Sequence, residues 1–79
     1  MVERRLIQIN GIVQGVGFRP FGFNSAVEFN LKGFVKNTAG GVEIEVEGSK
    51  KAIGKFTNRL ESKPPPLSII TEMNNKLIP

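Results

Sequence analysis

Residues 11–21 decide the fold, and they read Gly-Ile-Val-Gln-Gly-Val-Gly-Phe-Arg-Pro-Phe. Within this segment two glycines, Gly15 and Gly17, bracket a single apolar residue. Glycine adopts positive φ angles without steric cost, so consecutive backbone N–H groups can point into one concavity, and such a nest binds anions. The segment therefore predicts a tight turn from a strand into a helix, with an anion-binding concavity at the turn.

Arg19 follows this turn, and we predict that it is the N-cap of the helix, with Pro20 at the first helical position. Proline has no N–H to lose there, and it holds the preceding residue in the extended region that N-caps prefer. A guanidinium, a nest and a helix N-terminus in one place favour a phosphate group, because the planar guanidinium donates paired hydrogen bonds to phosphoryl oxygens. A turn with a surface arginine and no ligand is the alternative that the spacing leaves open.

The segments on both sides of the turn show two kinds of periodicity. Residues 6–13 alternate between apolar and polar side chains, which predicts a strand with one buried face. Residues 20–31 carry apolar side chains at helical spacing, which predicts a helix. Residues 33–37 and 42–47 read as a hairpin across the Gly40-Gly41 turn, with the carboxylates of its second strand in water.

The remaining elements complete the fold. Ser49 is expected to cap a second helix, which ends before the three prolines at 64–66 because proline cannot continue the helical hydrogen bonds. Residues 67–73 then resume as a strand. The order strand, helix, strand, strand, helix, strand predicts an α+β fold of the ferredoxin-like βαββαβ type, with two helices on one face of an antiparallel sheet. Its core is expected to hold all six phenylalanines, which are Phe18, Phe21, Phe23, Phe29, Phe34 and Phe56.

Length and composition restrict the possible chemistry. The chain has 79 residues, which suffice for one domain at 1–79, and it contains no Cys and no His. All seven of its acidic residues are glutamates. These absences exclude a cysteine nucleophile, a Ser–His dyad and the usual zinc ligands, so we expect no metal and no other cofactor. An enzyme of this composition has to act on a bond that is already reactive.

The formal net charge of +4 favours an anionic partner, which a phosphate ligand, a nucleic acid or a membrane surface would each satisfy. No window approaches the roughly 18 apolar residues of a membrane span, so we expect a cytoplasmic protein. Lys50, Lys51 and Lys55 are expected to form a solvated helix face. A nucleic-acid-binding module is the less favoured alternative, because residues 42–47 place carboxylates where RNA-recognition domains carry aromatic side chains.

Two segments closely resemble the signatures of the acylphosphatases. They are residues 11–19, Gly-Ile-Val-Gln-Gly-Val-Gly-Phe-Arg, and residues 33–38, Gly-Phe-Val-Lys-Asn-Thr. The spacing of eighteen residues between Arg19 and Asn37 is also similar to that of the family. The resemblance runs from about residue 6 to residue 73, and it implies a phosphohydrolase that acts on acyl phosphates and releases inorganic phosphate.

The resemblance also implies roles for individual residues. Arg19 would anchor the phosphoryl group, Asn37 would orient the attacking water, and Thr38 would support Asn37. The residues that would bind the phosphoryl group are Gln14, Gly15, Val16, Gly17, Phe18 and Arg19. Composition agrees independently, because the carboxylate that leaves an acyl phosphate needs no protonation, so positioning and charge neutralisation can suffice.

Two further segments point to one branch of the family. Residues 19–21, Arg-Pro-Phe, and residues 64–67, Pro-Pro-Pro-Leu, resemble the N-terminal acylphosphatase-like domain of the carbamoyltransferase used in hydrogenase maturation. This implies carbamoyl phosphate as a candidate substrate, and an accessory acyl-phosphate-binding domain of a larger polypeptide as the alternative function. The same resemblance implies that the chain is a domain excised from a larger protein. Residues 74–79 look too short for a full closing strand, so we expect slow turnover in isolation.

Overall fold

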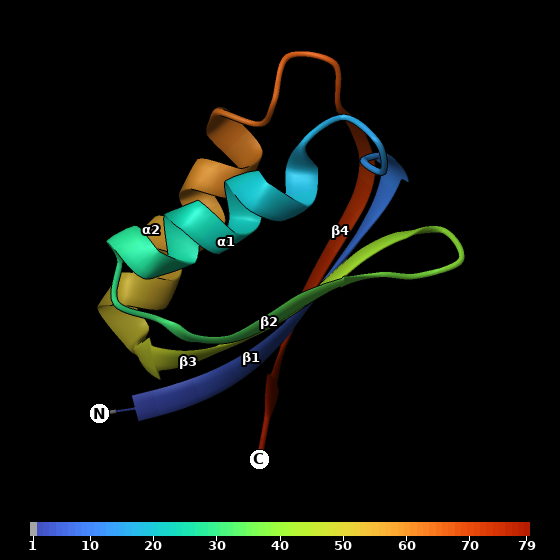
Figure 1. Ribbon diagram of the computed structural model, residues 1–79. Coiled ribbons are helices and arrows are strands. Elements are labelled where there is room, and N and C mark those ends of the chain that lie inside the picture. Colours follow the sequence, from blue (N-terminus) through green and yellow to red (C-terminus); the bar gives the residue numbers. More distant parts are fainter. Residues whose placement is uncertain (1) are drawn as a thin grey trace.

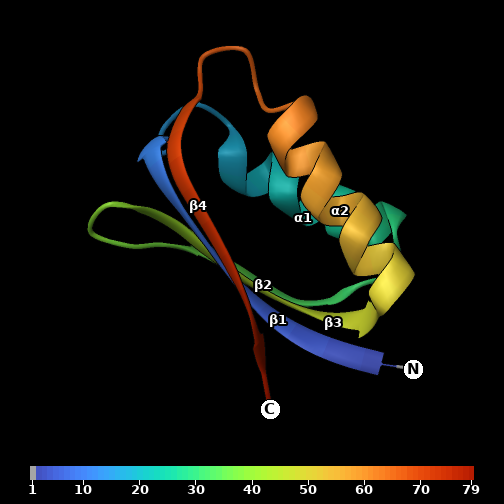
Figure 2. The ribbon, with the colours of Figure 1, turned by 180° about the vertical axis from the view of Figure 1, so that it is seen from behind.

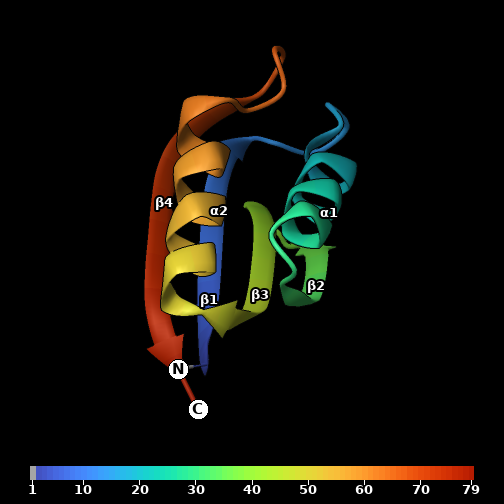
Figure 3. The same ribbon diagram turned by 90° about the vertical axis from the view of Figure 1, so that its left-hand side faces the viewer.

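The structure, a computed structural model, describes residues 2–79. Its elements follow one another in the predicted order: β1 (Val2–Ile12), α1 (Phe18–Glu28), β2 (Lys32–Asn37), β3 (Gly41–Ser49), α2 (Lys50–Ser62) and β4 (Ile69–Ile78). Both helices cover the same face of a four-stranded sheet, as Figure 1 and Figure 3 show. This arrangement confirms the predicted α+β, ferredoxin-like fold. Within residues 2–79, neither helix has the length and apolar composition needed to cross a membrane.

The sheet topology brings the two signature segments to one end of the sheet. The strands lie in the order β2-β3-β1-β4, and each neighbouring pair is antiparallel. Because β3 separates β1 from β2 and runs against both, β1 and β2 point in the same direction. Residues 13–17, which leave β1, and residues 38–40, which leave β2, therefore lie at the same end of the sheet (Figure 1).

The core lies between the sheet and the helices, and strand alternation decides which side chains enter it. On β1 and β3 every second side chain in the middle of the strand faces the helices and is buried, while the buried side chains of α2 recur at three- and four-residue spacing. Burial of one such apolar side chain stabilises the fold by about 1.5–3 kcal/mol. The core residues are Ile7, Ile9, Val13, Phe18, Leu31, Val42, Ile44, Val46, Ile53, Phe56 and Leu60.

The phenylalanines divide between core and surface, so the expectation of six core phenylalanines is wrong for two of them. Phe18 and Phe56 are fully buried, Phe21 and Phe29 are partly buried, and Phe23 and Phe34 are exposed. In α1 the buried positions are Phe18, Gly22 and Ser25, and position 23 points away from that line. In β2, Phe34 lies on the opposite face from its neighbour Val35, which packs against the core.

The last strand corrects a second expectation. β4 is ten residues long and pairs with β1 from Arg4 opposite Ile78 to Ile12 opposite Ile69. Figure 2 shows β4 beside β1 from behind. The prediction of a short stub at the C-terminal end is therefore wrong. Residues 74–76 are polar and break the apolar alternation, but a strand at a sheet edge is held by backbone hydrogen bonds and can keep its side chains in water.

Candidate active site

The turn between β1 and α1 has the glycine geometry that the sequence predicts. Gly15 and Gly17 have φ angles of 74° and 86°. A Cβ atom at either position would meet no atom within 4 Å, so the backbone angle, and not a lack of space, requires glycine there. The prediction of a left-handed glycine turn at this place is confirmed.

Helix α1 begins earlier than predicted. Its N-cap is Gly17, so Arg19 is the second helical residue and Pro20 the third, and the predicted N-cap at Arg19 is wrong. Proline is tolerated at the third position because the N–H groups of the first turn have no intrahelical partner in any case. The backbone hydrogen bonds of the helix begin with the one that the Phe21 N–H donates to Gly17 O at 3.2 Å. Arg19 is exposed at the positive end of the helix dipole.

Two apolar side chains hold the turn against the protein. Phe18 is fully buried, and its ring meets the ring of Phe21 edge-on with centroids 5.6 Å apart. Val16 packs partly against the same core. Because Phe18 points inward, its neighbour Arg19 is directed to the surface of the first helical turn. The apolar residues of this segment therefore anchor the turn.

Asn37 is the last residue of β2 and lies opposite Val42 of β3. Side chains alternate along a strand, so Asn37 shares a face with Val35, which packs toward the helices. Asn37 thus lies on the helix side of the sheet, at the end where α1 begins. Thr38 follows it, and the Thr38 N–H donates to Gly41 O at 2.9 Å, which closes the turn of the hairpin.

A side-chain amide connects the two signature segments directly. Gln14 Nε2 donates to Thr38 O at 2.6 Å and to Gly41 O at 2.7 Å. Sequence reasoning missed this contact, and no pattern in the sequence signals it, because residues 24 and 27 positions apart meet only through the sheet topology. Within residues 2–79 no hydrogen bond joins Arg19 to Asn37, and no glutamate pairs with Arg19.

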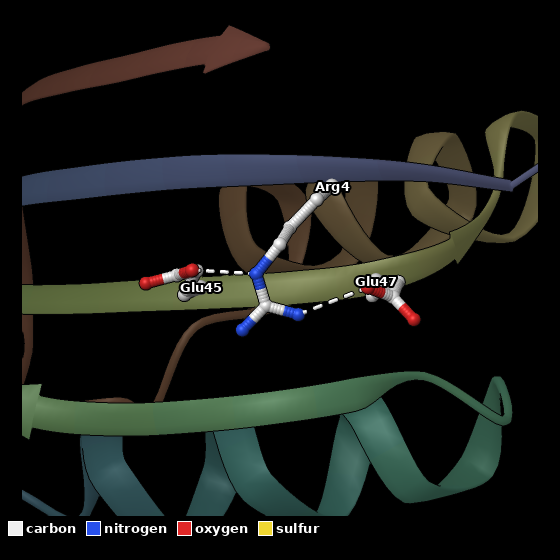
Figure 4. Close-up of polar contacts among 3 residues, drawn as sticks. All are labelled: Arg4, Glu45 and Glu47. Carbon is white, nitrogen blue, oxygen red and sulfur yellow. Dashed lines mark hydrogen bonds and ion pairs between the residues drawn. The ribbon is translucent and has the colours of Figure 1, made fainter. Parts of the chain in front are cut away.

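The open face of the sheet, which the helices leave uncovered, carries the glutamates of β3. Arg4 Nε lies 2.5 Å from Glu45 Oε1, and Arg4 Nη1 lies 3.2 Å from Glu47 Oε1 (Figure 4). The hydrogen bond to Glu45 raises the pKa of Arg4 above its usual value. Lys36 Nζ lies 3.4 Å from Glu43 Oε1. The glutamates of β3, which we expected to lie in water, are thus half-buried and paired with cations from β1 and β2. Among the described residues, no three acidic groups gather as a metal site.

The lysines at the start of α2 lie far from the turn. Lys50, Lys51 and Lys55 are exposed, as predicted. Lys50 follows Ser49, which pairs with Val2 at the beginning of β1, and so these lysines lie at the opposite end of the sheet from residues 13–17. They cannot act on a ligand that is bound at the glycine turn.

Comparisons with known proteins find two groups of relatives for this chain. The sequence profile of the family described as Acylphosphatase matches residues 6–79. The probable carbamoyltransferase HypF of Methanocaldococcus jannaschii is 53% identical over 68 residues, which are 86% of this chain and 9% of that protein. The acylphosphatase of Thermotoga petrophila is 41% identical over 69 residues, which are 86% of this chain and 76% of that protein.

Solved structures show the same two groups of relatives. Full-length HypF in its phosphate- and nucleotide-bound form superposes with a TM-score of 0.97 at 49% identity, over 99% of this chain and 10% of that one. The acylphosphatase of Bacillus subtilis superposes with a TM-score of 0.87 at 37% identity, over 99% of this chain and 86% of that one. The chain thus spans about a tenth of the length of the carbamoyltransferases that it matches.

Proposed function

Because this chain belongs to the acylphosphatase family, we propose that it hydrolyses acyl phosphates, including carbamoyl phosphate, and releases inorganic phosphate. The observation that carries the proposal is the arrangement at one end of the sheet. There the Gln14 amide joins the glycine turn, which leads into α1, to the hairpin loop that follows Asn37. An anion-binding turn and a side-chain amide at the same end of the sheet are the parts that water attack on a phosphoryl group requires.

The phosphoryl group would be bound by the turn, the start of α1 and Arg19. The positive φ angles of Gly15 and Gly17 suit a nest, and the first turn of α1 supplies further N–H groups without intrahelical partners. Arg19 is exposed and is paired with none of the described glutamates, so its guanidinium can donate two hydrogen bonds to phosphoryl oxygens. The residues in this proposed cradle are Gln14, Gly15, Val16, Gly17, Phe18 and Arg19.

Asn37 would orient the attacking water, with Thr38 as its support. The Asn37 amide can accept a hydrogen bond from water through its oxygen and donate one to the phosphoryl group through its nitrogen, a combination that a carboxylate cannot make. The water oxygen forms the new bond to phosphorus, the bond between phosphorus and the acyl oxygen breaks, and the carboxylate or carbamate leaves with the electron pair. One proton of the water passes to solvent. This leaving group needs no general acid, which fits a chain without Cys and His.

A second candidate function is that of an accessory domain that binds an acyl phosphate within a larger carbamoyltransferase. The observation that favours it is the 53% identity to a probable carbamoyltransferase of which this chain spans 9%. In that case residues 1–79 are one acylphosphatase-like domain of a cytoplasmic protein, and the partners are further domains of the same polypeptide. The glutamates of β3, which are paired with Arg4 and Lys36, speak against a nucleic-acid-binding sheet.

The test is to measure acetyl phosphate and carbamoyl phosphate hydrolysis by residues 1–79, and to titrate inorganic phosphate while following the backbone amides by NMR. We expect turnover, and amide shifts from Gly15 to Arg19. Arg19→Ala should abolish both while the fold stays intact, and Arg19→Lys should remain poor because an ammonium lacks the planar fork.

Arg5→Ala is the matched control, because it removes an arginine in the first half of β1 whose only described ion pair is the part-buried one with Glu3. It should leave binding and turnover unchanged. Phosphate binding without turnover in the unsubstituted chain would favour the accessory domain. Amide shifts on β3 in place of the turn would show that the site is assigned wrongly.

A further inference from the structure

We infer that the Gln14 side chain does not contact the substrate but is a positioning residue, which locks the phosphate turn to the strand that ends in Asn37. The inference rests on the proposed function, since it assigns a role in that reaction. It differs from the role that the resemblance implies for Gln14, because it leaves only the backbone of this residue to the phosphate cradle.

The donors of the Gln14 amide are fully used within the protein. The Nε2 group carries two hydrogens, and the two bonds that it donates, to Thr38 O at 2.6 Å and to Gly41 O at 2.7 Å, are at or below the short end of the N–H···O range. The only other polar atom of the side chain is Oε1, which accepts hydrogen bonds and repels an anion. The Gln14 side chain therefore has nothing left with which to bind a phosphoryl group.

The two carbonyl groups that receive these bonds belong to one closed turn. Gly41 O also accepts from the Thr38 N–H at 2.9 Å. Gly41 is buried and lies opposite Asn10 of β1, and a Cβ atom at position 41 would overlap the carbonyl oxygen of Ile9. The hairpin loop thus packs closely against β1, and the Gln14 amide donates a hydrogen bond to each of its two carbonyl groups.

The position of Asn37 depends on these two hydrogen bonds because β2 is an edge strand. β2 pairs only with β3, and its last pair is Asn37 with Val42. The hydrogen bond from Gln14 to the carbonyl oxygen of Thr38, the residue after Asn37, gives the end of β2 a second connection, to the glycine turn. Catalytic groups have to be held within about 0.5 Å, and a misplacement of about 1 Å can lower a rate about 10²-fold.

Gln14→Met tests the inference, because methionine keeps the length of the side chain and loses both donors. We expect kcat to fall by about 10- to 100-fold, while the Kd for inorganic phosphate stays within about threefold, since the backbone nest and Arg19 remain. Gln8→Met is the matched control. Gln8 donates to Glu43 Oε2 at 3.3 Å on the open face, so its replacement should leave kcat unchanged.

A double-mutant cycle separates positioning from a general effect on the fold. If Gln14 acts through Asn37, Gln14→Met should lower kcat by less than about threefold in an Asn37→Ala background, because the group that it positions is already absent. A loss of the same size in both backgrounds would overturn the inference. A loss of phosphate affinity as large as the loss of kcat would also overturn it, since the side chain would then be a ligand.

An NMR measurement on the unsubstituted chain keeps the inference testable if Gln14→Met does not fold or if the chain shows no turnover. The side-chain NH₂ of Gln14 should exchange slowly with solvent, in contrast to that of Gln8. On addition of inorganic phosphate it should shift much less than the backbone amides of residues 15–19. Fast exchange of this NH₂ group, or a phosphate-induced shift as large as those of the backbone amides, would contradict the positioning role of Gln14. Absence of turnover with slow exchange would instead contradict the proposed function, and with it the catalytic role of Gln14, while the link between the turn and β2 would stand.

Discussion

Asn37 is expected to act on turnover more than on binding, because its amide orients water while the turn and Arg19 hold the phosphoryl group. Asn37→Ala should lower kcat for acetyl phosphate by about 10²-fold or more, which is the scale of a lost transition-state contact. The Kd for inorganic phosphate should change by no more than a few fold. Steady-state hydrolysis and a phosphate titration on the same preparation measure the two quantities.

Asn24→Ala is the control for this prediction, since Asn24 is exposed on α1 and takes part in none of the described side-chain hydrogen bonds. It should alter neither quantity. If Asn37→Ala weakens phosphate binding as much as it lowers kcat, then Asn37 belongs to the cradle and the water has another partner.

The two helices are joined by a contact that should respond to pH. Arg59 Nη1 of α2 lies 2.7 Å from Glu28 Oε1 of α1, and the Arg59 guanidinium stacks over the Phe29 ring at 4.7 Å from its centroid. The hydrogen bond from Arg59 lowers the pKa of Glu28 below its usual value. A carboxyl group whose pKa is lowered by folding stabilises the protein above its unfolded pKa, and this contribution disappears as the pH falls through the folded pKa.

We therefore expect NMR titration to give a pKa for Glu28 below the usual value of a glutamate, and Arg59→Met to return it to that value. The difference in unfolding free energy between the unsubstituted chain and Glu28→Gln should be present at neutral pH and should vanish in acid. It should be small, because the pair is solvent-exposed. A difference that persists in acid would show that packing, and not the charge on Glu28, is responsible.

Stability of the whole sheet should depend on residues 74–78, contrary to the expectation of a weak C-terminal end. These residues pair with Arg4 to Gln8, so they hold the first half of β1, which is otherwise bound only by β3. Removing residues 74–79 should lower the free energy of unfolding. Each lost hydrogen bond contributes about 0.5–1.5 kcal/mol, partly offset by the entropy of the freed chain. Urea denaturation of the two chains measures the difference.

The same truncation tests how stability and activity are connected. β4 and β2 are the two opposite edges of the sheet, so loss of residues 74–79 does not reach Asn37 directly. Under conditions where both chains are folded, kcat should be nearly equal. An unchanged denaturation midpoint would show that the end of β4 contributes nothing, and a large loss of kcat in the folded short chain would show coupling across the sheet.

The sequence predicts the order of the elements, the buried face of α2 and the glycine turn. Each of these features depends on residues that are close together in the chain. Ile53, Phe56 and Leu60 recur at helical spacing and are buried, and Gly15 and Gly17 have the positive φ angles that their positions suggest. Such features follow from local periodicity and backbone preference. The resemblance to acylphosphatases was readable for the same reason, since each signature is a short continuous segment.

Other features were decided only in three dimensions. β4 extends through polar residues because β1 offers a backbone partner, and Phe23 is exposed because the sheet meets α1 at Phe18, Gly22 and Ser25. Gly11 marks a register shift between β1 and β4, where a Cβ atom would overlap the backbone of Ile69. The Gln14 bonds to Thr38 and Gly41 belong to the same class. Sequence alone therefore determined the type and order of the elements and the glycine turn, through interactions between near neighbours. Only the tertiary structure decided which distant backbone groups meet, because that depends on the order and register of strands in the sheet.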